Sequence, residues 1–264
     1  MTGLQFRMLA LTLVVLLAAG CAQKTLRDDG GDPDATGNIG SPLARPSPAD
    51  VYIDLSGAYL RDGRLTDAFM NAKKAVIVDP QLSNAHYMLA LVYQRLGETG
   101  SAEASYQRAV SLDSRNPVAL NAFGSFLCEQ GRYKESDSYF QRALSNPLYS
   151  TPWIAWSNAG WCAEKAGDTA RAEQDYREAL GLNSRFAPSL LGMARLSYAD
   201  ANYLSARAYL QRYAEVAPQT AESLWLGVQT EYQLGDKNQM ASYSLKLRTM
   251  YPDSEQAKYL KTIE

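Results

Sequence analysis

The sequence predicts an all-α fold, a right-handed superhelix (α-solenoid) of six helix-turn-helix repeats, and three observations lead to it. A 34-residue pattern recurs six times between Ala49 and Ser254, with only Thr151 and Pro152 inserted after the third copy. Small side chains recur at positions 20 and 27 of most copies. Position 15 is glycine in five copies and alanine in one: Gly63, Gly97, Gly131, Gly167, Ala201 and Gly235. A pattern of this period is typical of stacked helix pairs.

Each copy predicts two helices, A over positions 1–14 and B over positions 18–31. The copies span 49–82, 83–116, 117–150, 153–186, 187–220 and 221–254. The glycine at position 15 ends helix A because glycine accepts a positive φ. Proline at position 32, as in Pro80, Pro218 and Pro252, cannot continue helix B and turns the chain into the next copy. One pair cannot bury its apolar face alone, so neighbouring pairs complete the core.

This pattern resembles the tetratricopeptide (TPR) repeat, which has an aromatic residue at position 4, small residues at 8, 20 and 27, and proline at 32. Position 24 adds large side chains, among them Tyr106, Phe140 and Tyr176. The last segment, 255–264, is polar and follows Pro252, so we expect a C-terminal capping helix there.

The N-terminal residues 1–20 predict a signal peptide. Arg7 precedes an apolar run of about twelve residues, which is too short to cross a bilayer. The run ends in Leu17-Ala18-Ala19-Gly20-Cys21, which resembles a bacterial lipobox. That resemblance implies cleavage before Cys21, lipidation (diacylglycerol and palmitate) of its thiol and, because Ala22 follows, an outer-membrane lipoprotein whose domain faces the periplasm. The alternative is a plain secretory signal with an incidental cysteine.

Residues 21–48 predict a disordered tether after the lipidated cysteine. The stretch from Ala22 to Pro48 holds four glycines, four prolines and four aspartates among 27 residues. Such a composition buries too little apolar surface to repay the loss of chain entropy. We expect the repeat domain to hang from the membrane through this segment.

Composition argues against catalysis and against nucleic acid as a partner. The 26 Lys and Arg balance the 28 Asp and Glu, and no basic stripe appears. The single histidine, His86, falls at a core-facing position, and the chain contains no metal-binding HExxH, phosphate-binding P-loop or nucleophile elbow. We therefore expect a protein that is not an enzyme and that has no cofactor, no metal and no small-molecule substrate.

Cys128 and Cys162 fall at positions 12 and 10 of helix A in copies three and four. Neighbouring A helices run side by side in a TPR stack, and the periplasm is oxidising. We predict a disulfide between the two cysteines, which requires Cα atoms within about 7 Å. The alternative is two buried free thiols that act as small apolar fillers.

Positions 2, 5, 9, 12 and 13 of each helix A are expected to face the concave groove. There they place aromatic and aliphatic side chains beside arginines and amides, which is a composition typical of a protein-binding surface. The predicted groove residues are Ile53, Leu60, Arg61, Asn84, Tyr87, Leu91, Gln94, Arg95, Asn121, Ser125 and Trp161. For Trp161 the alternative is packing between repeats.

Two stretches resemble a narrower family, the type IV pilus biogenesis lipoproteins called PilF or PilW (pilotins). They are Leu120–Tyr133 (LNAFGSFLCEQGRY) and Asn146–Pro152 (NPLYSTP) with the nearby Asn158–Asp168 (NAGWCAEKAGD). The sequence departs from the family at Ala122, where a second asparagine is frequent. The resemblance implies an outer-membrane lipoprotein that helps the pilus secretin reach the outer membrane and form multimers, or that stabilises pilus fibres. Its partners would then be the secretin or other pilus proteins. The rival reading is a lipid-anchored scaffold that organises peptidoglycan enzymes.

Overall fold

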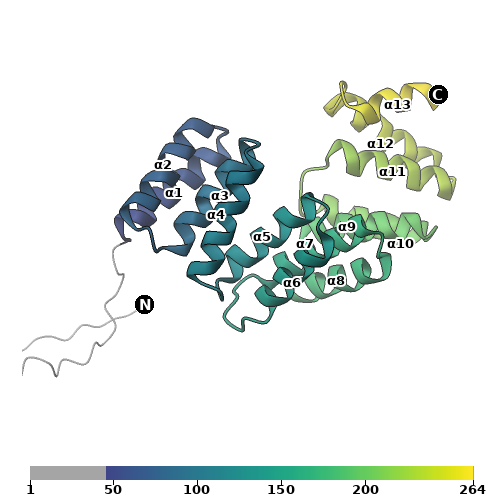
Figure 1. Cartoon of the computed structure of the whole chain (residues 1–264). Coiled ribbons are helices and arrows are strands. Elements are labelled where there is room, and N and C mark those ends of the chain that lie inside the picture. Colours follow the sequence, from purple (N-terminus) through teal and green to yellow (C-terminus); the bar gives the residue numbers. More distant parts are fainter. Residues whose placement is uncertain (1–45, 264) are drawn as a thin grey trace, which may run out of the picture. The chain divides into compact units, whose positions relative to one another are not determined.

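The structure is a computed structural model that describes residues 46–263, and over this range it contains thirteen helices and no strand. The helices follow one another through short loops (Figure 1). This arrangement confirms the predicted α-solenoid. The predicted signal peptide, Cys21 and nearly all of the predicted tether lie outside the described residues.

Six helix pairs and one final helix make up the described region. The pairs are α1 (Pro48–Arg61) with α2 (Leu65–Val78), α3 (Ser83–Arg95) with α4 (Thr99–Leu112), α5 (Pro117–Glu129) with α6 (Tyr133–Leu144), α7 (Pro152–Ala166) with α8 (Thr169–Leu182), α9 (Ala187–Ala199) with α10 (Tyr203–Ala214), and α11 (Ala221–Leu234) with α12 (Lys237–Met250). The last helix is α13 (Glu255–Ile263). Each pair corresponds to one predicted copy of the repeat, except that α1 and α7 each begin one residue before their copy, at Pro48 and Pro152.

The helices contact their neighbours in chain order. Each first helix packs on its own second helix, each second helix packs on the next pair, and the first helices of adjacent pairs also touch. The residue at position 15 ends the first helix of every pair with a positive φ, between 72° and 82° for the five glycines and 56° for Ala201. Ala201 therefore adopts the left-handed turn that glycine provides elsewhere, at a steric cost.

The insertion between copies three and four lengthens the loop from Ser145 to Thr151. Pro152, the second inserted residue, is the first residue of α7, where its fixed φ suits a helix start. The loop is anchored by Tyr149, which is only 7% exposed and packs into the core of the second and third pairs.

The core runs along the stack as a series of clusters. In the largest, the rings of Tyr106, Phe123 and Phe126 pack at centroid distances of 5.3–6.2 Å. Buried alanines, such as Ala102 and Ala109, let the backbones approach closely around these rings. The apolar positions of successive repeats thus supply a series of clusters that follow one another along the stack.

The sixth pair departs from the apolar pattern at Glu231, and the structure shows how the departure is accommodated. Glu231 is 2% exposed, and both of its carboxylate oxygens accept hydrogen bonds from Arg207 on α10. The buried charge is therefore paired across two repeats, as a buried carboxylate requires. Beyond it, Ala257 and Leu260 of α13 cover Leu224 and Leu247.

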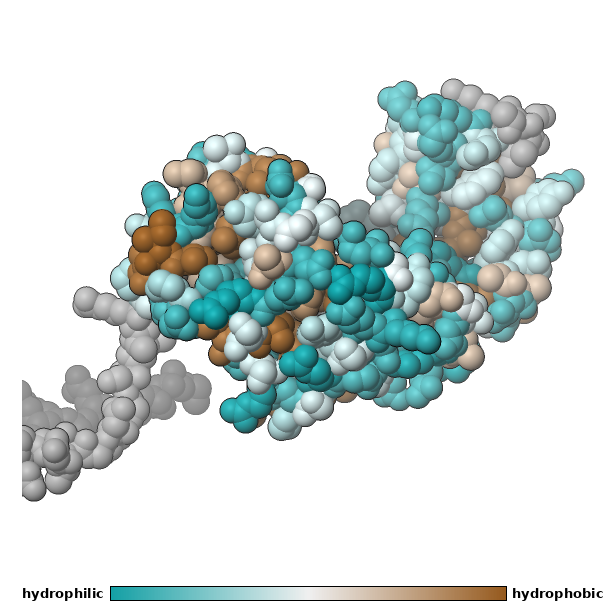
Figure 2. Space-filling view, viewed as in Figure 1, coloured by the Kyte–Doolittle hydropathy of each residue, from teal (hydrophilic) through white to brown (hydrophobic). Residues whose placement is uncertain are grey.

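The surface is uneven in character. In Figure 2 the apolar (brown) surface gathers over the N-terminal helices, whereas much of the rest of this face is hydrophilic. Ile77 (73%) and Met70 (52%) of α2 contribute to the exposed apolar surface. None of the helices in residues 46–263 is both long enough and apolar enough to cross a membrane.

Candidate functional site

The predicted groove contains two separate depressions. The first, which we call the N-terminal groove, has a volume of about 800 Å³ and lies over the first three repeats. Its lining residues are Ile53, Asn84, Tyr87, Asp113, Ser114, Arg115, Asn116, Pro117, Val118, Arg142, Ser145, Asn146, Pro147 and Leu148. Four of them, Ile53, Asn84, Tyr87 and Val118, occupy predicted groove positions.

Apolar side chains line the N-terminal groove. Val118 is 42% exposed and Leu148 is 87% exposed. Tyr87 is half-buried against the core cluster, and burial, with a contribution from Tyr149, raises the pKa of its hydroxyl. The groove therefore offers a neutral, partly desolvated aromatic face beside freely exposed aliphatic groups.

Amide side chains fix the walls of the N-terminal groove. Asn116 donates to the side-chain oxygen of Asn84 (2.8 Å) and, through its own side-chain oxygen, caps the start of α5. Asn146 donates to the carbonyl of Arg115 (2.8 Å) and accepts from the backbone N–H of Leu148 (2.9 Å). These bonds hold Leu148 at the rim, so its exposure is a property of an ordered loop.

Polar residues lie between the two depressions. Gln94 accepts from the Tyr106 hydroxyl (2.7 Å) and donates to Glu129 (2.7 Å). Ser125 donates to the backbone carbonyl of Asn121 (3.1 Å). These predicted groove residues thus make hydrogen bonds that link neighbouring repeats or stabilise a helix.

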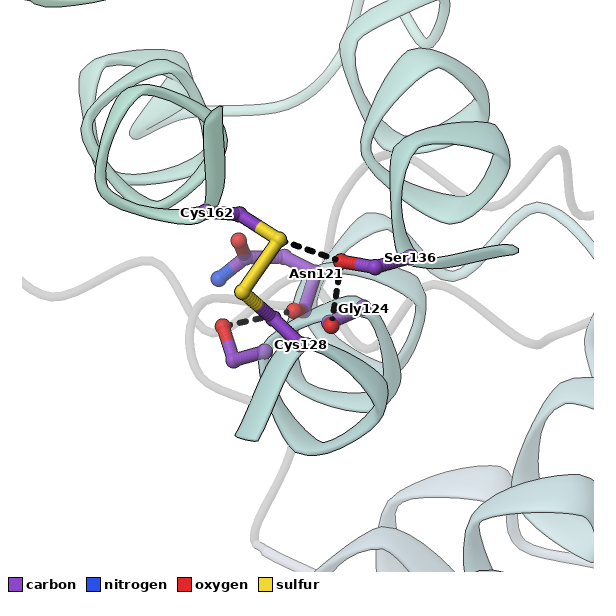
Figure 3. The surroundings of a disulfide bond; sticks show 6 residues. Asn121, Gly124, Cys128, Ser136 and Cys162 are labelled. Atoms are coloured by element: carbon purple, nitrogen blue, oxygen red, sulfur yellow. Dashed lines mark hydrogen bonds between the residues drawn. A yellow bond between two sulfur atoms is a disulfide. The ribbon is translucent and has the colours of Figure 1, made fainter. Parts of the chain in front are cut away.

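Cys128 and Cys162 form a disulfide in the structure, with their Cα atoms 5.7 Å apart. Figure 3 shows the bond joining α5 to α7, with Ser136 beside it. The Ser136 hydroxyl donates to the Gly124 carbonyl (2.7 Å) and lies 3.4 Å from Cys162 Sγ. The bridge is buried, and it holds the first helices of the third and fourth repeats together.

The second depression, which we call the central depression, has a volume of about 320 Å³ and lies between α7 and α9. It is lined by Ser157, Asn158, Trp161, Tyr176, Ala187, Pro188, Leu191, Arg195 and Tyr213. Trp161 is half-buried and packs against two core clusters while it lines this depression. Trp161 therefore both packs between repeats and contributes to the surface of the depression, as the two alternative predictions for it describe.

The remaining predicted groove residues line neither depression. Leu60 packs with the cluster of the first two repeats, and Leu91 packs on the large central cluster. Arg61 and Arg95 are exposed in the last turns of α1 and α3. They flank the surface but do not contribute to either cavity.

His86 is half-buried, and its Nε2 lies 3.0 Å from the carbonyl oxygen of Pro80. Within the described residues, no group of three or more His, Cys, Asp or Glu side chains could hold a metal ion.

Sequence reasoning missed the contribution of the loops to the N-terminal groove. Arg115, Asn116, Asn146 and Leu148 lie outside the A-helix positions that define a TPR groove. The two-residue insertion was the available signal, because Thr151 follows Leu148 by three residues and the insertion lengthens the loop that forms the rim.

Comparisons with known proteins identify the repeats and the family. Family models for tetratricopeptide repeats match residues 83–116 and 118–145, and a model for the middle TPR-like domain of cilia and flagella-associated protein 70 matches 137–249. The type IV pilus assembly protein PilF of Pseudomonas aeruginosa is 33% identical over 249 residues, which is 92% of this chain and 94% of PilF. An uncharacterised protein of Haemophilus influenzae is 30% identical over 48% of this chain and 70% of its own length.

Solved structures agree with the sequence relatives. The structure of Pseudomonas aeruginosa PilF superimposes with a TM-score of 0.73 and 33% identity, over 82% of this chain and 97% of PilF. The structure of PilW, described as a widely conserved type IV pilus biogenesis factor, superimposes with a TM-score of 0.73 and 28% identity, over 82% of this chain and 99% of PilW. With identity above 30% along nearly the full length of both chains, this protein belongs to the PilF/PilW family of TPR proteins of type IV pilus biogenesis.

Proposed function

We propose that this protein is a non-enzymatic pilotin, anchored in the outer membrane by lipid at Cys21, that promotes outer-membrane localisation and multimerisation of the pilus secretin. Family membership supports a role in pilus biogenesis, and the lipobox-like end of the apolar run supports the anchor. The partner would bind through the N-terminal groove. The anchor would hold groove and cargo at the same membrane.

The N-terminal groove is the single observation that carries the binding proposal. Protein-binding hot spots combine aromatic and aliphatic anchors with polar groups that fix orientation. The N-terminal groove places Tyr87, Val118 and Leu148 together with the ordered amides Asn84 and Asn116. Leu148 (87% exposed) and Val118 (42% exposed) line the same groove, and a bound partner would bury both side chains together.

Charge at the N-terminal groove is modest. Arg142 donates to the carbonyl of Ser114 (3.2 Å), and its guanidinium carbon lies 5.2 Å from the Tyr139 ring centroid. Asp113 accepts from the backbone N–H of Arg115 (3.0 Å). The apolar contact, rather than charge attraction, would therefore supply most of the affinity.

The second candidate is a lipid-anchored periplasmic scaffold that organises peptidoglycan enzymes. It would use the same anchor and the same groove with a different partner. The pilus relatives favour the pilotin, because the similarity to PilF covers 92% of this chain.

The test begins with a deletion strain of the native host, complemented with variants of the chain. Tyr87→Ala with Leu148→Ala should abolish heat- and detergent-resistant secretin multimers in isolated outer membranes, while secretin monomer persists. The pair is chosen because both residues line the groove, whereas Leu91 does not, and circular dichroism of the purified variant checks that the loss of the Tyr87 ring leaves the helices folded. Ile77→Ala with Leu245→Ala is the matched control, since both side chains are exposed (73% and 67%) on second helices.

A Cys21→Ala arm tests the anchor in the same strain. We expect a folded protein that is lost from the outer membrane and impaired piliation. Normal multimers and normal pili in the deletion strain would discard the pilotin role. Co-purification of cell-wall hydrolases without secretin would support the scaffold instead.

A further inference from the structure

The central depression has the charge balance of a site for a neutral group. Arg195 donates to both carboxylate oxygens of Glu164 (2.8 and 2.9 Å) and to Glu222 (3.0 Å). Burial alone would raise the pKa of the Glu164 carboxyl. The hydrogen bonds and charge of Arg195, together with a hydrogen bond from the Tyr176 hydroxyl (2.9 Å), outweigh burial, so the pKa of Glu164 lies below its usual value. Arg195, the charged residue that lines the depression, already pairs with two carboxylates, so an anionic ligand would meet no unpaired guanidinium there.

Apolar surface completes the central depression. Trp161 on α7 faces the same cavity as Pro188 and Leu191 on α9. Lys165, the nearest other cation, lies with its ammonium 5.7 Å from the Trp161 ring centroid. A neutral aliphatic side chain is the group that this lining would bury with the least loss of hydration.

A pair of amides borders the central depression, and one hydrogen bond between them leaves one nitrogen and one oxygen without a partner in the part of the chain that the structure describes. Asn158, a lining residue, donates through Nδ2 to Oδ1 of Asn121 at 3.0 Å. Within the described residues, neither Asn121 Nδ2 nor Asn158 Oδ1 has a hydrogen-bond partner, and neither atom is sealed from solvent. The pair thus offers one donor beside one acceptor.

The free donor and acceptor match the polar groups of a peptide backbone, which carries one acceptor and one donor per residue. Asn121 is 8% exposed, so its amide is held in a packed setting. In Figure 3 Asn121 is drawn beside the disulfide that joins α5 to α7. Because the disulfide links the two helices that carry the pair, it also limits how far the amides can separate.

We propose that the central depression and the amide pair form a second protein-binding site, which takes an extended polypeptide segment. Asn121 would donate to a backbone carbonyl, Asn158 would accept from a backbone N–H, and a neutral aliphatic side chain would lie between Trp161 and Leu191. The site deepens the proposed function, since it assumes that this concave surface binds protein, but it does not depend on the N-terminal groove.

The test uses the full-length chain in detergent and capped heptapeptides of serine and threonine with one central test residue. Peptides with central leucine, glutamate or lysine are compared by NMR titration of the side-chain amide and indole signals, assigned with Asn158→Ala and Trp161→Phe. We expect the leucine peptide to bind at least about tenfold more tightly than the charged peptides. Methylation of the leucine backbone nitrogen, or Asn158→Ala, should each weaken binding about five- to tenfold, because each removes a hydrogen bond.

Controls separate this site from the N-terminal groove. Leu191→Ala should weaken the leucine peptide to a similar degree, whereas Gln174→Ala, which removes an exposed amide from α8, should not. Tyr87→Ala with Leu148→Ala should also leave the peptide affinity unchanged. Equal affinity for the charged peptides, no binding of the leucine peptide, or binding that survives both Asn158→Ala and Leu191→Ala would overturn the second site, while the secretin assay above would still decide the first.

Discussion

Asp175 on α8 is an acid that the fold keeps from water. Its side chain is 2% exposed, and its Oδ2 has no hydrogen-bond partner of acceptable geometry, although Arg171 Nε lies 3.5 Å away. Burial raises the pKa of Asp175 to about 6, while the charge of Arg171 opposes the shift. Arg171 itself is directed mainly to Asp137 on α6, at 2.6 Å.

The raised pKa makes a prediction about pH. A carboxyl whose folded pKa lies above its unfolded value of 3.8 favours the protonated folded state, so its contribution to stability falls as pH rises from about 4 through about 6. Asp175→Asn removes this loss. We expect the variant to gain in melting temperature over the parent at pH 7.5 but to match it, or lie below it, at pH 4.

Thermal unfolding followed by circular dichroism at both pH values measures this difference. The parent-minus-variant comparison cancels the other carboxyls, such as Glu164, whose lowered pKa acts in the opposite direction. Glu178→Gln, which changes an exposed carboxylate on the same helix, is the control and should leave the pH dependence in place. Parallel curves for Asp175→Asn and the parent would contradict the assignment.

Within a repeat, the two helices pack through the contact between a small residue on the first helix and an aromatic ring on the second helix. A methyl group added at Gly160 of α7 would lie 2.9 Å from the Tyr176 ring of α8, and one added at Gly124 of α5 would lie 2.9 Å from the Phe140 ring of α6. In both repeats glycine at position 8 faces the aromatic residue at position 24. The two helices approach as closely as the absent side chain allows.

Gly160→Ala should therefore loosen the fourth repeat. We expect a loss of about 1–3 kcal/mol in unfolding free energy, the usual range for an overpacked core, despite the better helix propensity of alanine. Gly181→Ala on α8 is the matched control, because nothing lies within 4 Å of the added methyl group. This control should be neutral or stabilising by up to about 1 kcal/mol in urea unfolding. Equal effects of the two changes would show that ring contact does not limit the spacing.

At the scale of the whole molecule, periodicity predicts the stack but not the binding surface. The glycine positions predict the ends of the first helices, and even Ala201 keeps the left-handed turn, with φ 56°, because the repeat requires it. Two residues that touch within one repeat, such as those at positions 8 and 24, are separated by the same number of residues in every copy. Such contacts can therefore be predicted from the repeat pattern. The composition of helix A likewise predicted which face would carry aromatic and amide groups.

The two depressions could not be predicted, because they depend on pairs of side chains from different repeats and on a loop that the two-residue insertion lengthens. Asn116 and Asn84 are 32 residues apart, and Asn158 and Asn121 are 37 residues apart. Whether such side chains meet depends on the offset between neighbouring helices, which no local rule gives. Leu148 is placed by hydrogen bonds of Asn146 in the loop after the third repeat, which the insertion of Thr151 and Pro152 lengthens.

In a stack of repeats, each repeat is stabilised by contacts with its immediate neighbours alone. A covalent bond between two central repeats therefore strengthens the interface through which the two halves of the array are coupled. The Cys128–Cys162 disulfide closes a loop with a sequence separation of 34 residues in the middle of the stack. The chain-entropy model gives about 3–4 kcal/mol for a loop of this length. We expect Cys128→Ser with Cys162→Ser to lower the urea midpoint accordingly and to broaden the transition, because the two halves of the array would no longer be tied together. Reduction of the parent by dithiothreitol should lower the urea midpoint by the same amount and should leave the midpoint of the double variant unchanged. If neither reduction nor the double substitution changes the midpoint, the buried packing around Phe140 and Ala159 holds these repeats together without the bond.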